Sequence, residues 1–466
     1  TPPVNVLNLA NNGRELVFYR VTERVDHVST VRPGVIARLD GFIANNYLVD
    51  QNTTPGDIRH GQFHNSDNMR MAECTPVLVW AYMQPDSQFY HDPAVLNSAI
   101  WSVDYMVRAQ GSNGGFNEDQ GWCGVPNRTP GKSSVTGFTL HALGDAITLL
   151  AGLPEMQPRL LELMDANGTG NNDTQRFAAW TNLLAQAMPY QFSGNGRGHA
   201  PNQDLCALEA VYSINDAFAA LTGGARLKTQ TEIDALANEI FYGHPSAASA
   251  RPDGRWFSDT GLLAEAGHSY FGYDGNYGMR VSMEYLSLLS LHDTTAAGFL
   301  ATKYAEALQY FFVPDESAWL GVYAENAISR RSTGDPMDTG MLPYGLAHDF
   351  HPAMSRLYQI TLPYFAGAPV ANMTFDSPHM YQVGVWMYCE WLDHFLTAPP
   401  QDVTYLVPAE RSEAWVFEDS LLKTRVSKPE GGVVTFYSEI WDATNQARRH
   451  VWKTAPETIP SLNLYP

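Results

Sequence analysis

The segment QDLCALEAVYSINDAFAALT, residues 203–222, shows the pattern that decides the fold. Its apolar residues recur three to four positions apart, for example at Ala207, Val211 and Ile214. This spacing places them on one face of an α-helix. The same period continues through most of the chain, whereas the alternation of strands and helices typical of a parallel sheet is missing. We therefore expect a mainly α-helical protein.

Loops rich in glycine, asparagine, aspartate and proline separate the predicted helices. One helix start is especially clear, because Asp92 is a good N-cap residue and Pro93 then occupies the first helical position. The predicted helices cover residues 34–49, 68–83, 93–109, 134–152, 175–189, 203–222, 230–241, 278–292, 295–312, 341–362 and 376–397.

Six of these helices are rich in small and apolar residues and are predicted to form an inner layer: 68–83, 134–152, 203–222, 278–292, 341–362 and 376–397. Long loops and the lack of a short sequence repeat favour antiparallel helical hairpins arranged as an (α/α) toroid, an incomplete barrel. Loops at one end of the inner helices would shape a cleft. After TAPPQD (397–402) the segments VTYLV, AWVFED, LLKTRVS and GVVTFYSEIW are short and β-branched or rich in aromatic residues. We therefore predict a toroid domain over 1–400 and a small β-rich appendage over 401–466.

The composition limits the possible functions. A net charge of −20 over 466 residues argues against nucleic acid as a partner. No apolar run approaches the ~18 residues that span a bilayer. No leader of charged and then apolar residues opens the chain at Thr1, and we expect the mature protein to be secreted or periplasmic. Composition does not indicate the oligomeric state, and no cofactor motif is present.

The four cysteines, Cys74, Cys123, Cys206 and Cys389, are far apart and form no CxxC pair. A zinc site of the usual spacing is therefore not expected, and we assign no metal site. The cysteines are either buried thiols or form one or two disulfides. Sequence alone leaves both possibilities open.

The segment GHSYFGYDGNYG, residues 267–278, is the strongest candidate for chemistry. It places His268 and Tyr277 nine residues apart, directly before a predicted inner helix. Its glycines allow a tight loop and a close approach of the backbone to a ligand. Ordinary packing of a histidine and several tyrosines is the simpler interpretation, but their density at this position favours a functional site.

The longer stretch HSYFGYDGNYGMRVSMEYLSLL resembles the His-to-Tyr segment of polysaccharide lyase family 8, the hyaluronate, chondroitin and xanthan lyases. His268, Tyr273 and Tyr277 keep the register of that family's pattern, which implies that Tyr273 contacts the substrate. The resemblance implies a toroid and a β-elimination reaction on a polysaccharide that contains uronic acid. Family 8 enzymes are longer than this chain, which is closer in size to the toroidal alginate and glucuronan lyases.

Three further segments resemble the family in the expected order. HAPNQDLCALEAVYSI implies that Asn202 binds the substrate carboxylate, with His199 as a nearby contact, although Ala200 and Pro201 replace the family's glycines. YAENAISRRSTGD matches one family arginine at Arg330. Asn326 stands where the family has a second arginine, and Arg331 would compensate. NEDQGWCGVPNRTPGK implies sugar contacts through Trp122 and Asn117, although simple packing explains Trp122 equally well.

The resemblance also implies roles in the reaction. Removal of the C5 proton of a uronic acid builds negative charge on its carboxylate, which Asn202 and Arg330 would bind. Tyr277 would take the proton and protonate the leaving O4. His268 would hold the carboxylate or act as the base for the epimeric uronate.

Other interpretations of the sequence remain. The loop HGQFHNSDNMR places His64 and Arg70 before an inner helix, where they would contact substrate, bind a metal or simply be solvated. A glycoside hydrolase on the same toroid would need two carboxylates ~5–9.5 Å apart; the candidates are Asp119, Asp204, Asp274 and Glu284. A glycan-binding protein without catalytic activity is the third possibility.

Overall fold

A computed structural model describes most of the first half of the chain, in four stretches: residues 27–63, 68–117, 122–193 and 201–242. It also describes parts of the later chain, at residues 285–286, 288–289, 291–292, 302–303, 306, 312–313, 321–322, 351–356, 386, 389 and 405–406, and the strands at 414–417, 422–427, 433–442 and 447–454. Predictions that concern other residues lie outside the described part.

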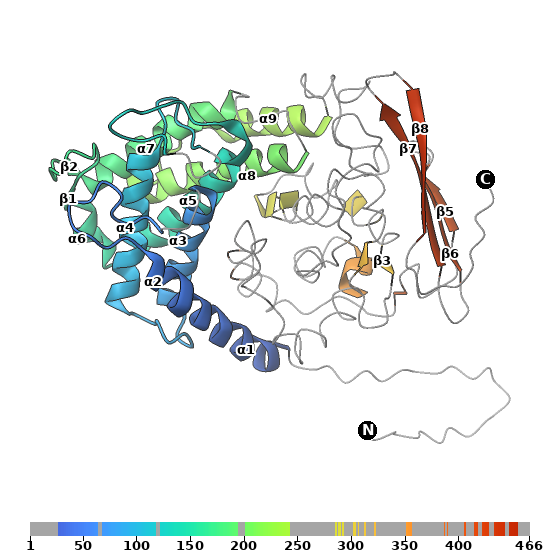
Figure 1. Ribbon diagram of the computed structural model, residues 1–466, viewed down its shortest axis with the longest axis horizontal. Coiled ribbons are helices and arrows are strands. Elements are labelled where there is room, and N and C mark those ends of the chain that lie inside the picture. The colour runs from blue at the N-terminus through green and yellow to red at the C-terminus, as the bar shows by residue number, and fades with distance from the viewer. Residues whose placement is uncertain are drawn as a thin grey trace.

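The described first half is built from helices, as predicted (Figure 1). They are α1 (His27–Phe42), a π-helical turn (Ile43–Tyr47), α2 (Leu48–Asp50), α3 (Asn68–Met83), α4 (Pro93–Ala109), α5 (Ser133–Ala151), α6 (Met156–Leu160), α7 (Arg176–Phe192), α8 (Pro201–Thr222) and α9 (Gln230–Tyr242). The bounds predicted for α3 and α4 are confirmed, and those for α5, α7, α8 and α9 are close. The short helix α6 and the two-residue strands β1 (Leu163–Met164) and β2 (Thr174–Gln175) were not predicted.

The predicted start of the first helix is wrong. We expected it at residue 34, whereas α1 begins at His27 and contains Pro33. An interior proline removes one backbone hydrogen bond and is unfavourable within a helix. Contacts from outside the helix hold this turn: Arg32 donates to Asp86 (Nε to Oδ2, 3.0 Å) and to Gln84 (Nη2 to Oε1, 2.6 Å) after the end of α3.

The start of α4 is the one that the sequence predicts. Asp92 has an extended backbone, and its Oδ1 accepts a hydrogen bond from the backbone N of Ala94 at 2.8 Å. Pro93 follows as the first helical residue, where its missing N–H costs nothing. Behind this cap, α4 buries an apolar face that includes Val95, Ile100 and Val103.

Three helices, α3, α5 and α8, form a layer in which α5 packs between the other two. Helices α5 and α8 run parallel, because Gly137 lies against Ala207 and Gly144 against Ser213. The approach is close: a Cβ on Gly144 would lie 2.6 Å from the carbonyl carbon of Ser213. Helix α3 lies on the opposite side of α5 from α8. The ends of α3 and α5 lie together, because the hydroxyl of Tyr82, near the end of α3, donates to Glu155, shortly after the end of α5.

Helices α4 and α7 cover this layer from outside (Figure 1). Each runs opposite to the layer's helices, because Arg108 near the end of α4 binds the loop before α3, and Gln191 near the end of α7 lies against Gly137 near the start of α5. A buried ion pair joins them: Arg176 at the start of α7 donates Nε and Nη2 to the carboxylate of Asp104 on α4, at 3.0–3.1 Å. The indole of Trp180 donates to the same carboxylate at 2.9 Å. Successive helices therefore form antiparallel hairpins, which confirms that part of the prediction.

Later segments that were predicted to be inner helices also contribute to this core. Leu286 and Leu289 are helical and fully buried, as the prediction for 278–292 requires. Trp386, within the predicted helix 376–397, is helical and donates its indole N–H to Asp145 of α5 at 2.9 Å. Residues about 240 positions apart in the chain thus share a partly buried hydrogen bond.

The C-terminal part contains a four-stranded antiparallel sheet with the order β5 (Ala414–Phe417), β6 (Leu422–Ser427), β7 (Val433–Asp442), β8 (Ala447–Thr454). The β-rich composition predicted strands at the first three. Strand β8 was missed, since its sequence ARRHVWKT is charged, and Tyr405 in the predicted segment VTYLV is not in a strand. A further short pair, β3 (Phe312–Val313) with β4 (Gly321–Val322), lies within the chain before this sheet.

All four cysteines are buried thiols, so the first of the two possibilities left by the sequence is correct. Among the described residues, no helix is long and apolar enough to cross a bilayer.

The glycine contact between α5 and α8 gives a first prediction. Gly144→Ala places a methyl group against the Ser213 backbone, so we expect a loss of about 1–3 kcal/mol in the free energy of unfolding, which exceeds the ~1 kcal/mol gain in helix propensity. Urea unfolding would measure it. Gly41→Ala in α1 is the matched control, since a Cβ there meets nothing within 4 Å. Equal stabilities for both variants would contradict the close approach.

A second prediction concerns pH. The Nε2 of His292 lies 2.8 Å from Oε1 of Glu209 on α8, and its ring stacks on Tyr212. Burial lowers the pKa of His292, but the Glu209 carboxylate outweighs burial and the pKa is raised above 6.5. The charged pair therefore stabilises the fold fully below the unfolded pKa, and the contribution is lost as pH rises through the folded pKa.

We expect His292→Gln to lower the free energy of unfolding by about 1–3 kcal/mol at pH 5.5, with a smaller difference from wild type at pH 8.5. Urea titrations at the two pH values would measure this change. In the Glu209→Gln background the same substitution should show little pH dependence. An equal loss in the free energy of unfolding at both pH values would mean that the pair is not charged in the folded protein.

Candidate functional site

The amino-terminal ends of α3, α5 and α8 lie at one end of the inner layer, since these helices pack side by side and run parallel. Sequence-predicted site residues share this position. Arg70 lies in the first turn of α3, Asn117 and Trp122 lie in the loop before α5, and Asn202 lies in the first turn of α8. The inner layer therefore brings these segments to the same end, where helix dipoles favour a negatively charged ligand.

Asn202 is the predicted catalytic residue whose geometry is described. Its side chain is 4% exposed, and its Oδ1 accepts a hydrogen bond from the backbone N of Gln203 at 2.9 Å. A backbone N–H only donates, so this contact fixes which side-chain atom is oxygen. The Nδ2 group then points elsewhere, and no described residue accepts from it. Asn202 is thus oriented as a donor.

Gln191, the penultimate residue of α7, was not predicted. It is fully buried, and its Nε2 lies 3.2 Å from the place of a Cβ on Gly137 of α5. Neither polar atom of its amide has a hydrogen-bond partner in the described part of the chain, and the same holds for Oε1 of Gln203. Buried polar atoms without partners cost about 1–3 kcal/mol each, so these atoms beside the start of α8 need partners from beyond the described residues.

Trp122 makes contacts that belong to the protein interior. Its indole Nε1 donates to the Val125 carbonyl at 2.6 Å, and its ring lies 5.3 Å from that of Tyr105 on α4. The Arg59 guanidinium lies over the ring, 5.6 Å from its centroid. Packing therefore accounts for Trp122, and its role in stacking on sugar stays a prediction. Asn117 is half-buried, beside the bridge that pairs Phe116 with Lys132.

The other predicted contacts lie outside the described residues and stay predictions: His64, His199, His268, Tyr273, Tyr277, Arg330 and Arg331. Arg70 has a described place in α3, but its side chain lies outside the described part. Of the acids considered for a glycoside hydrolase, Asp204 is described, and it is fully buried in the first turn of α8. Within the described residues, no group of three or more His, Cys, Asp or Glu side chains is placed to hold a metal ion.

A buried arginine holds the loops at this end and was also missed by sequence analysis. Arg108, near the end of α4, donates to the carbonyls of Ile58, His60 and Asp165. Burial lowers its pKa, and the charge of Asp104 opposes that effect. Its three partners are backbone carbonyls from two separate loops. Every residue has such a carbonyl, so the sequence does not indicate which residues Arg108 binds.

Comparison with known proteins places the fold. No protein-family model matches the chain, and no curated protein matches it significantly. Among solved structures, the Paenibacillus xanthan lyase is 13% identical, with a TM-score of 0.50 over 89% of this chain and 37% of that chain. The chondroitin AC lyase of Streptomyces coelicolor A3, solved in complex with chondroitin sulphate, is 10% identical, with a TM-score of 0.48 over 94% of this chain and 55% of that chain.

At such identities the likeness to the xanthan lyase shows the fold alone. The chain spans about a third of the length of that lyase and about half that of the chondroitin lyase. The resemblance inferred from the sequence is therefore confirmed at the level of the fold, and the protein has the mainly helical, toroidal architecture of a polysaccharide lyase.

Proposed function

We propose that the protein is a polysaccharide lyase that cleaves a uronic-acid-containing polysaccharide by β-elimination and leaves a 4,5-unsaturated uronate end. The observation that carries the proposal is Asn202. It lies in the first turn of an inner helix, its oxygen is held by the backbone of Gln203, and its N–H₂ group has no partner among the described residues. The fold, which is like that of a xanthan lyase, supports the same reaction class.

The chemistry explains why such a donor matters. The C5 proton of a uronic acid is weakly acidic, and its removal moves negative charge onto the neighbouring carboxylate. A donor that is already oriented toward that carboxylate stabilises the transition state more than the ground state. Asn202 fills this role in the proposal, helped by the amino-terminal end of α8 and by Arg330.

The proton transfers are assigned to Tyr277 and His268. Tyr277 takes the C5 proton and returns a proton to the leaving O4, so that the C4–O4 bond breaks and the C4–C5 double bond forms. A free phenol has a pKa near ~10, and cationic or hydrogen-bonding neighbours must lower it for work at neutral pH. Arg330 and His268 supply them, and His268 is the base for the epimeric uronate.

Tyr277→Phe tests the acid–base assignment, because it removes the hydroxyl and keeps the ring. Wild type and variant would be incubated with hyaluronan, chondroitin, glucuronan, alginate and xanthan, and ultraviolet absorbance of the unsaturated product would be followed. We expect product from at least one polymer with wild type, and a rate lowered by about 10²–10⁴ in the variant. Absence of product from every polymer would rule out the proposed reaction.

Asn202→Asp is a sharper test of the donor. The aspartate keeps the oxygen that accepts from the Gln203 backbone, but it turns the free donor into a carboxylate oxygen that repels the substrate. We expect kcat to fall by about 10²–10³ while the thermal unfolding midpoint is kept, since a carboxylate suits a helix amino terminus. Asn45→Ala, at an exposed position, is the control. Full activity of Asn202→Asp would exclude Asn202 from the site.

A further inference from the structure

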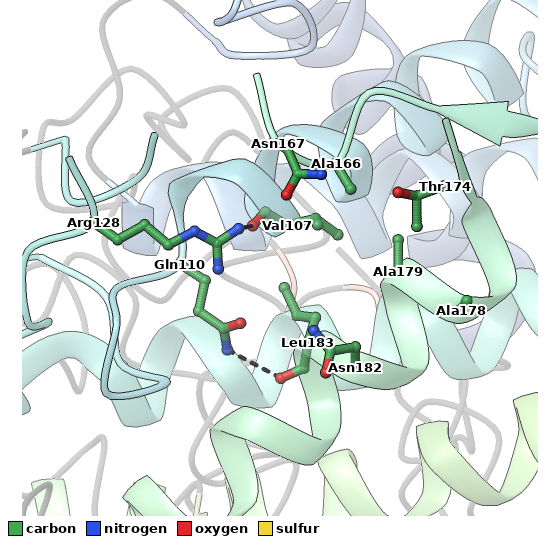
Figure 2. Close-up of a pocket in the computed structure, with 10 residues that line it drawn as sticks. All are labelled: Val107, Gln110, Arg128, Ala166, Asn167, Thr174, Ala178, Ala179, Asn182 and Leu183. Atoms are coloured by element: carbon green, nitrogen blue, oxygen red, sulfur yellow. Dashed lines mark hydrogen bonds between the residues drawn. The ribbon is translucent and has the colours of Figure 1, made fainter. Parts of the chain in front are cut away.

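A hollow lies on the outer side of the helical layers, between α4 and α7 (Figure 2). Its volume is about 250 Å³, which leaves room for one sugar ring. The walls come from the end of α4, from α7 and from the loops before α5 and α7. Figure 2 shows Arg128 and Gln110 on one side of it and Thr174 and Ala178 on the other, with Asn167 between them.

The walls of this hollow are held firmly. The Gln110 amide donates to the carbonyls of Leu183 on α7 and Gly114 in the loop, both at 3.0 Å. Gly114 has a φ of +86° and lies so close to the Gln186 carbonyl that a Cβ there would clash. The small residue Ala178 leaves the space that a larger side chain on α7 would fill. The cavity is thus formed before any ligand binds.

Arg128 gives the cavity a positive charge that the described structure does not neutralise. Its Nη2 donates to the Val107 carbonyl at a long 3.5 Å, and it forms no ion pair with any described residue. By contrast, Arg159, Arg176 and Arg226 each pair with a carboxylate at 3.0 Å or less. In a chain of net charge −20, a half-buried guanidinium that no described carboxylate pairs with is well suited to bind an anion at a cavity.

Two amides complete the polar lining. Asn167 and Asn182 line the cavity, are exposed, and have no hydrogen-bond partner among the described residues. Side-chain amides both donate and accept, as sugar hydroxyls do. Ala178, Ala179 and Leu183 supply an apolar wall. One cation, free amides and an apolar wall together match a single sugar ring that carries a carboxylate or a sulphate.

We propose that this pocket binds one anionic sugar unit of the polysaccharide, through Arg128 to its acidic group and through Asn167 and Asn182 to its hydroxyls. The proposal rests on the proposed function, because it takes the ligand to be the same polymer. Arg128 lies four residues before Lys132, which adjoins the start of α5, so one loop joins this outer pocket to the inner end where Asn202 lies.

A second binding point on the protein affects only polysaccharides long enough to reach both the pocket and the inner end. A polymer that is held at the pocket raises the effective concentration of its neighbouring units at the inner end, without any change in the chemical step. The KM for polymer should therefore depend on the pocket, whereas kcat should not. A tetrasaccharide, bound only at the inner end, should be insensitive to it.

Three variants test the proposal. Arg128→Gln removes the charge, Ala178→Leu fills the cavity and keeps the charge, and Arg226→Gln removes the same charge from an exposed site paired with Asp216. Binding to hyaluronan, chondroitin sulphate, glucuronan, alginate and xanthan would be measured by affinity electrophoresis. Initial rates would be measured on the polymer bound most tightly and on its tetrasaccharide, with thermal unfolding as a check of folding.

For Arg128→Gln and Ala178→Leu we expect binding of the polymer to weaken about threefold to tenfold, in the range of one charge-assisted hydrogen bond partly screened by water. The KM for polymer should rise by a similar factor, with kcat and the tetrasaccharide kinetics unchanged. Arg226→Gln should match wild type. Equal effects on polymer and tetrasaccharide, unchanged binding in both pocket variants, or the same loss in Arg226→Gln would overturn the proposal.

The binding measurement keeps the two proposals separate. If no polymer yields an unsaturated product but binding still depends on Arg128 and on the open cavity, then the lyase reaction fails and the pocket stands. If the unsaturated product forms normally and both pocket variants bind polymer as tightly as wild type does, then the pocket proposal is wrong and the lyase proposal stands.

Discussion

The contact between α5 and α8 is the constraint on which the described helical part depends. At Gly144 of α5 the backbones approach until a methyl group would collide with Ser213, and at Gly137 a Cβ would lie only 3.3 Å from the backbone N of Ala207. These contacts pair Gly137 with Ala207 and Gly144 with Ser213, and this register sets the start of α8 beside the start of α5. The place of Asn202 is therefore a result of backbone packing, and the hydrogen bond from Gln203 then settles the direction of its amide.

The outer helices are held by a different kind of interaction. Asp104 and Arg176 are both buried, and each would be costly without the other, so α4 and α7 keep one relative position. Arg108 extends this arrangement by binding loop carbonyls at the end of α4. Arg128, in the loop before α5, differs from Arg176 because it forms no ion pair with a described residue and keeps only a long contact to the Val107 carbonyl.

Sequence reasoning succeeded where the signal is local. The period of apolar residues and the Asp92–Pro93 start gave α4 correctly, and small apolar residues marked α3, α5 and α8 as inner helices. It failed where distant residues decide: α1 continues through Pro33 because Arg32 is held by residues after α3.

The candidate site divides in the same way. Asn202 was reached through a motif resemblance, but the burial of Gln191 and the carbonyl contacts of Arg108 depend on segments far apart in the chain, so no single stretch of sequence carries a signal for them. Trp122 shows the limit of the motif itself, since the same residue suits a sugar platform or a packed ring, and its described contacts are those of packing.

The four buried thiols offer a way to follow local unfolding of the protein. Cys74 lies in α3, Cys123 in the loop before α5 and Cys206 in α8, and all are shielded from solvent together with Cys389. Burial raises the pKa of the Cys123 thiol, and a thiol reacts only as an accessible thiolate. Each cysteine should therefore react with a labelling reagent only when the helical hairpin that contains it unfolds locally. The labelling rates of the individual cysteines would show which helical hairpin unfolds first.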